Sequence, residues 1–133
     1  MRVLPENELA RIEKLHALEL INLGKDSEFD IFVEAAGLIA QCPMALIGIM
    51  DTEIQNIQSC IGIDIAHVDR KDTVCQYTLL KNTINIIPDT RLDDRTKNNE
   101  LIRAANINFY AGIPLITDDG FALGTVCVLG HEP

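Results

Sequence analysis

The sequence has 133 residues, which is enough for a single domain with one hydrophobic core. Hydrophobic residues make up 47% of the chain, too large a share for a disordered protein. Its 20 acidic residues outnumber the 11 basic ones, giving a formal net charge of −9. This charge argues against binding to nucleic acid or to an anionic membrane surface, since both depend on Lys and Arg. No apolar run approaches the roughly 18 residues of a membrane-spanning helix, so we expect no membrane insertion.

The four cysteines are scattered through the chain as Cys42, Cys60, Cys75 and Cys127. None belongs to a Cys-x-x-Cys pair, and no His stands at zinc-finger spacing, so no metal site is predicted. The first residues carry no signal-peptide core, and we therefore expect a cytoplasmic protein with reduced cysteines. The sequence does not identify a cofactor.

Apolar residues at a spacing of three predict an amphipathic helix from Glu8 to Ile21, with Pro5 ahead of it and Gly24 after it. A stripe with this spacing turns slowly around a helix, so one sheet face need not cover all of it. The part near Leu9 and Ile12 is expected to remain exposed and to mediate self-association. Packing of the whole stripe on its own domain is the alternative.

A second helix is predicted after a cap at Asp26 or Ser27, and it ends before Pro43. The next elements are short. They are expected to be strands over Met44 to Met50, Ile54 to Ile61 and Thr83 to Ile87, a loop over Gly62 to His67, a short helix from Cys75 to Leu79 capped by Asp72 or Thr73, and a helical turn near Leu101 to Ala105.

Two apolar runs close the sequence, Ile107 to Leu115 and Ala122 to Leu129. The turn between them contains Asp119-Gly120, so the pair is predicted to form a β-hairpin. Two helices followed by at least five short strands indicate an α+β domain. We expect a mainly antiparallel sheet of five to six strands, with helices packed on one face and short inserted helices over a pocket.

The amino-acid sequence of this hairpin resembles that of a GAF domain, in Phe109-Tyr110-Ala111-Gly112-Ile113-Pro114-Leu115 and in Leu123-Gly124-Thr125-Val126-Cys127-Val128. Shorter matches extend the resemblance along most of the chain, to the GAF domains of bacterial histidine kinases and diguanylate cyclases. They are Asn7 to Leu18, Glu28 to Ala36, Pro43 to Asp51, Ile86 to Thr90 and Asp93 to Asn99.

The resemblance implies that residues 1–133 form one sensory GAF domain of a bacterial signalling protein, such as a two-component system. Such domains bind a small molecule, form homodimers, or do both, and control a kinase or cyclase output domain, which would lie outside this sequence. The sequence leaves two alternatives to a ligand-binding domain open. The first is a dimerisation scaffold without ligand, and the less favoured one is an enzyme similar to free methionine sulfoxide reductase.

Five residues are candidates for the ligand pocket: Cys75, Asp89, Tyr110, Thr125 and Cys127. Cys75 begins a short helix and is either a pocket group or a buried structural thiol. Asp89 is either a polar ligand anchor or an Asx-turn. Tyr110 either stacks on a ligand or belongs to the core. Thr125 and Cys127 share one face of a strand and either reach the pocket or pack under the helices.

We expect the pocket between the sheet and the segment from Asp72 to Leu80, with a small neutral or cationic ligand in this acidic chain. We do not expect an enzyme. The sulfoxide reductases need further cysteines in the loop before the last strands, and that loop, Asp89 to Asn106, contains none. A sulfenic acid on Cys75 would then lack a local resolving partner.

Overall fold

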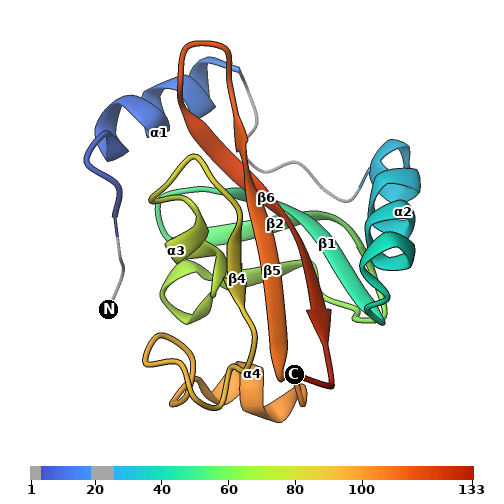
Figure 1. Cartoon of the computed structure of the whole chain (residues 1–133). Coiled ribbons are helices and arrows are strands. Elements are labelled where there is room, and N and C mark those ends of the chain that lie inside the picture. The colour runs from blue at the N-terminus through green and yellow to red at the C-terminus, as the bar shows by residue number, and fades with distance from the viewer. Residues whose placement is uncertain (1–3, 19–25) are drawn as a thin grey trace.

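A computed structural model describes residues 4–18 and 26–133, and in them a six-stranded antiparallel sheet forms the centre of the fold (Figure 1). The strand order is β3-β2-β1-β6-β5-β4. The bounds are β1 (Met44–Met50), β2 (Ile54–Ile61), β3 (His67–Asp69), β4 (Asn85–Ile87), β5 (Phe109–Ile116) and β6 (Ala122–Gly130). The helices are α1 (Glu8–Ala17), α2 (Asp30–Ala40), α3 (Cys75–Thr78) and α4 (Glu100–Ala104), with 3-10 turns η1 (Ser27–Phe29) and η2 (Arg70–Asp72). The predicted α+β architecture is confirmed.

The two faces of the sheet are covered by different helices, because alternate residues of each strand point to opposite sides. From β1, Ala45 and Ile47 pack with Val33 of α2 and Val128 of β6. On the other face, a larger cluster includes Leu46 and joins the strands to α3, α4 and the loop after β2. All seven residues of β1 are buried, as expected for a central strand covered on both sides.

A β-bulge in β2 explains why its apolar residues alternate poorly. Ile47 pairs with Ser59 whereas Gly48 pairs with Ile57, so Gln58 is the extra residue. Ile57 therefore belongs to the cluster on the pocket face, and Ile61 packs on the α2 side. The expected strand is confirmed, but the loop predicted over Gly62 to His67 ends in β3, which the sequence analysis missed.

Helix α1 ends at Ala17, with Leu18 as its C-cap, whereas the apolar spacing predicted a helix up to Ile21. Ile21 and Gly24 lie outside the described residues. Leu15 is buried against Ile49 and Leu123, and Ile12 packs against this group. Leu9 is 83% exposed. The expectation of an uncovered end is thus confirmed for Leu9 and wrong for Ile12.

Two buried arginines share one carboxylate and fasten α1 to the sheet. Glu8 accepts hydrogen bonds from Arg11 Nε at 2.9 Å and from Arg70 Nη1 at 2.7 Å. Arg11 also donates to the carbonyl of Met50, and Arg70 to that of Asp51. Arg70 opens η2, the turn that leads into α3. The Arg11–Glu8–Arg70 group, called the arginine triad below, therefore links α1 to the segment beside the pocket.

Candidate functional site

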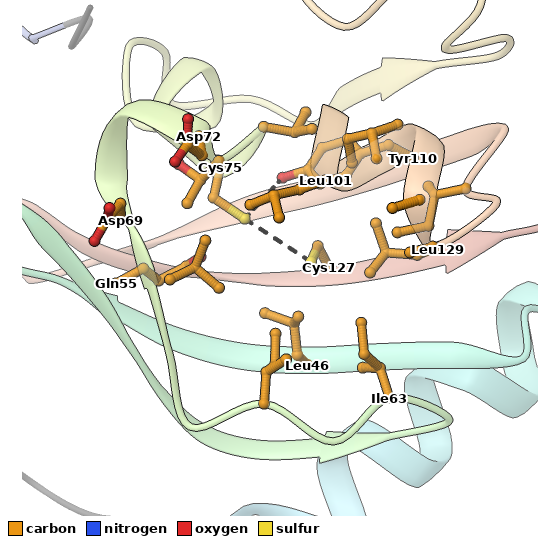
Figure 2. A pocket seen from close by; sticks show the side chains of 18 of the residues that line it. Leu46, Gln55, Ile63, Asp69, Asp72, Cys75, Leu101, Tyr110, Cys127 and Leu129 are labelled. Carbon is orange, nitrogen blue, oxygen red and sulfur yellow. Dashed lines mark hydrogen bonds between the residues drawn. The ribbon is translucent and has the colours of Figure 1, made fainter. Parts of the chain in front are cut away.

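A cavity of about 630 Å³ lies between the sheet and the segments that cross over it (Figure 2). Its floor is formed by β1, β2, β5 and β6, and its walls by the loop after β2 together with β3, by the segment from Asp72 to Cys75, and by α4. The predicted position next to Asp72 to Leu80 is therefore correct for the first part of that segment. Most of the lining is apolar, including Leu46, Ile63, Ile65, Val74, Leu101, Ile102, Ile107 and Leu129.

The pocket lining includes two carboxylates and one imidazole, that of His67. Asp69 and Asp72 lie together at one end of the cavity, near Gln55, as Figure 2 shows. Neither Lys nor Arg contributes to the described lining. Asp69 is exposed and Asp72 is half-buried, and their negative charges repel an anionic ligand at this end of the cavity.

The wall segment before α3 is held by local hydrogen bonds of Thr73 and by one bond from α4. Thr73 Oγ1 donates to the carbonyl of Arg70 at 2.8 Å and accepts from the backbone N–H of Gln76 at 3.2 Å. The N-cap of α3 is Val74, whose side chain makes no capping bond, so the cap predicted at Asp72 or Thr73 lies one residue later, and Thr73 supplies the hydrogen bond to Gln76 from just before it. Asn99, the N-cap of α4, donates to the carbonyl of Asp72 at 2.8 Å. The pocket wall is thus tied to α4 by a hydrogen bond.

Two thiols meet where one wall of the pocket reaches its floor. Cys75 Sγ of α3 and Cys127 Sγ of β6 are 3.9 Å apart, and both residues line the cavity (Figure 2). The Tyr110 hydroxyl donates to Cys75 Sγ at 3.4 Å and lies 2.7 Å from Thr78 Oγ1. Gln55 Nε2 donates to Thr125 Oγ1 at 3.4 Å. We call this group the thiol cluster, made of Gln55, Cys75, Thr78, Tyr110, Thr125 and Cys127.

The surroundings shift the pKa values of the two thiols in opposite directions. The hydrogen bond from Cys127 lowers the pKa of Cys75, and bonds from Thr125, Tyr110 and Gln55 act in the same direction, against the effect of burial. The pKa of Cys127 is raised by its hydrogen bond with Cys75 and by burial. Burial likewise raises the pKa of Tyr110, which stays a neutral donor. Cys75 is therefore the thiol that loses its proton first.

Four of the five candidate residues, Cys75, Tyr110, Thr125 and Cys127, come together in this cluster. Asp89 does not belong to it. Its carboxylate accepts from the backbone N–H of Arg91 at 3.0 Å and pairs with the Arg91 guanidinium at 2.8 Å, which holds the pKa of Asp89 below its usual range. Asp89 therefore forms the Asx-turn, its carboxylate is engaged locally, and it is not among the residues that line the cavity.

The expectation that Cys75 lacks a local thiol partner is wrong. The loop from Asp89 to Asn106 contains no cysteine, but Cys127 of β6 lies next to Cys75. Gln55 was missed as well, because the bulge in β2 hides which residues share its face. In the described residues no group of three or more His, Cys, Asp or Glu side chains could hold a metal ion. No helix within residues 4–18 and 26–133 is long and apolar enough to span a membrane.

Comparison with solved structures identifies the fold. No protein-family model matches the sequence. The structure matches the GAF domain of an Acinetobacter phosphoenolpyruvate-protein phosphotransferase with a TM-score of 0.65 at 12% identity, over 94% of this chain and 77% of that one. It matches a type II free methionine-R-sulfoxide reductase of Thermoplasma acidophilum with a TM-score of 0.64 at 12% identity, over 80% and 74%. The chain is a GAF domain in its fold.

A curated relative is similar in sequence. The cyclic di-GMP phosphodiesterase PA2567 of Pseudomonas aeruginosa is 37% identical over 130 residues, which is 97% of this chain. The chain spans 22% of the length of that relative. The similarity thus covers nearly all of the GAF domain described here and a minor part of the phosphodiesterase.

Proposed function

We propose that this GAF domain is the ligand-binding regulatory part of a bacterial signalling protein and controls an output domain in cyclic di-GMP turnover. The observation that carries the proposal is the cavity of about 630 Å³, lined by apolar side chains with a few polar groups at one end. This size and composition are typical of sites for small molecules. The similarity to a much longer cyclic di-GMP phosphodiesterase supports the assignment to signalling.

The lining favours a neutral or cationic ligand over the dinucleotide itself. Cyclic di-GMP carries two phosphates, and phosphates are bound by Lys, Arg or free backbone amides. The described lining offers the carboxylates of Asp69 and Asp72 instead. In this proposal the regulatory ligand differs from the substrate of the output domain.

The route from pocket to helix α1 is part of the proposal. Asp72 lines the pocket, and Arg70, two residues earlier, is bonded to Glu8 of α1. A ligand that moves the segment from Asp69 to Thr73 would therefore act on α1 through the arginine triad. The coupling requires that the ligand binds the two positions of this segment with different affinities.

Native mass spectrometry of the protein purified from bacterial cells tests ligand binding. We expect an additional mass that is lost on denaturation. Ala105→Phe adds a ring at a pocket-lining position and should abolish this mass, whereas Ala10→Phe, on the exposed side of α1, should keep it. Bare protein alone in the wild-type spectrum would contradict the proposal. The domain is proposed to bind without catalysis, and turnover of free methionine sulfoxide with dithiothreitol would refute that part.

A scaffold that dimerises without ligand is the second candidate, favoured by the apolar surface of α2. Four large apolar side chains there are exposed by 61% to 84%, namely Ile31, Phe32, Leu38 and Ile39. A surface of this kind is typical of an interaction site. Homodimerisation is also compatible with ligand binding.

A further inference from the structure

The thiol pair of the pocket is built from two segments that the fold brings together. Cys75 begins α3 and Cys127 lies in β6, 52 residues later, yet their sulfur atoms are 3.9 Å apart. The other two cysteines have no such neighbour in the described residues, since Cys42 Sγ and Cys60 Sγ each bond to a backbone carbonyl, of Ala40 and Ile65. A pair of facing thiols can be oxidised together, whereas isolated thiols cannot form an internal disulfide.

We propose that Cys75 and Cys127 are a redox-active dithiol, which a small hydroperoxide entering the pocket oxidises to an intramolecular disulfide. Both residues are shielded from bulk water, with exposures of 4% and 2%, but both line the cavity. Only a reagent small enough to enter the cavity reaches them. The proposal does not depend on a bound regulatory ligand.

The hydrogen bonds assign a role to each sulfur. Asn85 donates to Thr78 Oγ1, Thr78 Oγ1 lies next to the Tyr110 hydroxyl, and that hydroxyl donates to Cys75 Sγ. This chain of donors ends on Cys75 and stabilises its thiolate. Cys75 is therefore the attacking thiolate and Cys127 the resolving thiol.

The reaction needs one equivalent of hydroperoxide and no other reagent. The Cys75 thiolate attacks the terminal oxygen of the peroxide, the O–O bond breaks, and the leaving oxygen takes a proton to give an alcohol or water. Cys75 is now a sulfenic acid. The Cys127 sulfur attacks the Cys75 sulfur, an S–S bond forms, the S–O bond breaks, and the hydroxide leaves as water with the Cys127 proton. The two thiols have lost two electrons and the peroxide has gained them.

The movement required is small. Disulfide sulfurs are about 2.0 Å apart, so a pair at 3.9 Å must approach by about 2 Å. The product would join α3 to β6 covalently and fix one wall of the pocket to its floor. An external dithiol would reverse the reaction by thiol–disulfide exchange.

Treatment of the full chain with hydrogen peroxide, followed by intact mass measurement and peptide mapping without reductant, tests the proposal. We expect the loss of two thiols, a decrease by the mass of two hydrogen atoms, and a linked peptide pair that contains Cys75 and Cys127. Dithiothreitol should restore both thiols. The Cys42→Ser/Cys60→Ser variant, which leaves the thiol cluster intact, should behave in the same way.

Variants of the cluster separate the two roles. Cys127→Ser should accumulate a sulfenic acid on Cys75 that dimedone traps, and Cys75→Ser should form neither disulfide nor adduct. The proposal is overturned if the Cys42→Ser/Cys60→Ser variant keeps both thiols under peroxide that fully oxidises free cysteine. It is also overturned if that variant only gains oxygen atoms without a linked peptide. Because that variant retains every residue of the cluster, neither result depends on a misfolded pocket.

Discussion

Substitution of Glu8 by Gln tests whether the arginine triad holds α1 on the domain. The side chains of Arg11 and Arg70 are fully buried, and that of Glu8 is 14% exposed. Glutamine keeps the shape of the carboxylate but removes the negative charge that both guanidinium groups share. Breaking a buried ion pair by removing one partner costs about 3–5 kcal/mol, because the remaining charge stays buried without compensation.

This loss is a large part of the stability of a small domain, which is typically about 5–15 kcal/mol. For a chain of this size it corresponds to a decrease in Tm of about 10–20 °C. Urea unfolding followed by circular dichroism measures the free energy directly. Glu13→Gln is the matched control, since Glu13 is an exposed residue of the same helix, and it should change the free energy of unfolding by less than about 0.5 kcal/mol.

The pH dependence gives a second test of the same carboxylate. Burial raises the pKa of Glu8, but the hydrogen bonds and charges of Arg70 and Arg11 outweigh burial, so the net pKa is below its usual value of 4.5. A group with a lowered folded pKa stabilises the fold above its unfolded pKa and loses this contribution as the pH falls through the folded value. The difference in the free energy of unfolding between wild type and Glu8→Gln should have its full size at pH 7 and should become smaller as the pH falls through the folded pKa of Glu8. A loss no larger than that of Glu13→Gln at pH 7 would refute the reasoning.

Three further predictions concern the thiol cluster and the surface. Alkylation of Cys75, followed by peptide mapping in Cys42→Ser/Cys60→Ser, should reach half its maximal rate near pH 6, as the pKa of about 6 implies, and a midpoint at the usual value of 9 would contradict this. Tyr110→Phe should lower the free energy of unfolding in urea by about 1 kcal/mol, since it removes one buried hydrogen-bonding group. It should also raise the pH midpoint of Cys75 alkylation, and an unchanged midpoint would exclude a role of the hydroxyl in stabilising the Cys75 thiolate. Sedimentation should show a dimer that either Leu9→Glu on α1 or Ile39→Glu on α2 dissociates, and a dimer that survives both would exclude these surfaces.

The sequence predicted the elements whose local pattern is strong. The strand from Met44 to Met50 is confirmed to the residue, because it is a continuous apolar run with clear ends. The hairpin is confirmed by the pairing of β5 with β6. Its signal in the sequence was Gly120, which lies in the turn with a φ of +93° that glycine adopts without strain. The sequence missed β3, which has only three residues. It predicted β2 but not which residues of β2 share a face, because the bulge at Gln58 breaks the alternation.

The candidate site was predictable in composition but not in its contacts. Strand parity places Thr125 and Cys127 on one face, and the family resemblance pointed to Cys75. Their proximity depends on the sheet order, which inserts β6 between β1 and β5, and on α3 folding back over that face. The loop in which the sulfoxide reductases carry further cysteines, Asp89 to Asn106 here, therefore gave no sign of the Cys127 thiol. Contacts across 52 residues follow from topology, which no local window contains.

The glycines of the strands show the same dependence on topology. In the sequence Gly112 is a residue of the closing hairpin. In the structure Gly112 pairs with Cys127, and a Cβ added to it would collide with the Tyr110 hydroxyl and lie 3.2 Å from Cys127 Cβ. Gly48 likewise leaves room for the Gln55 side chain. These two positions lack a side chain because polar groups of neighbouring residues cross them. Space on the sheet surface, rather than backbone freedom, is what glycine contributes to the thiol cluster.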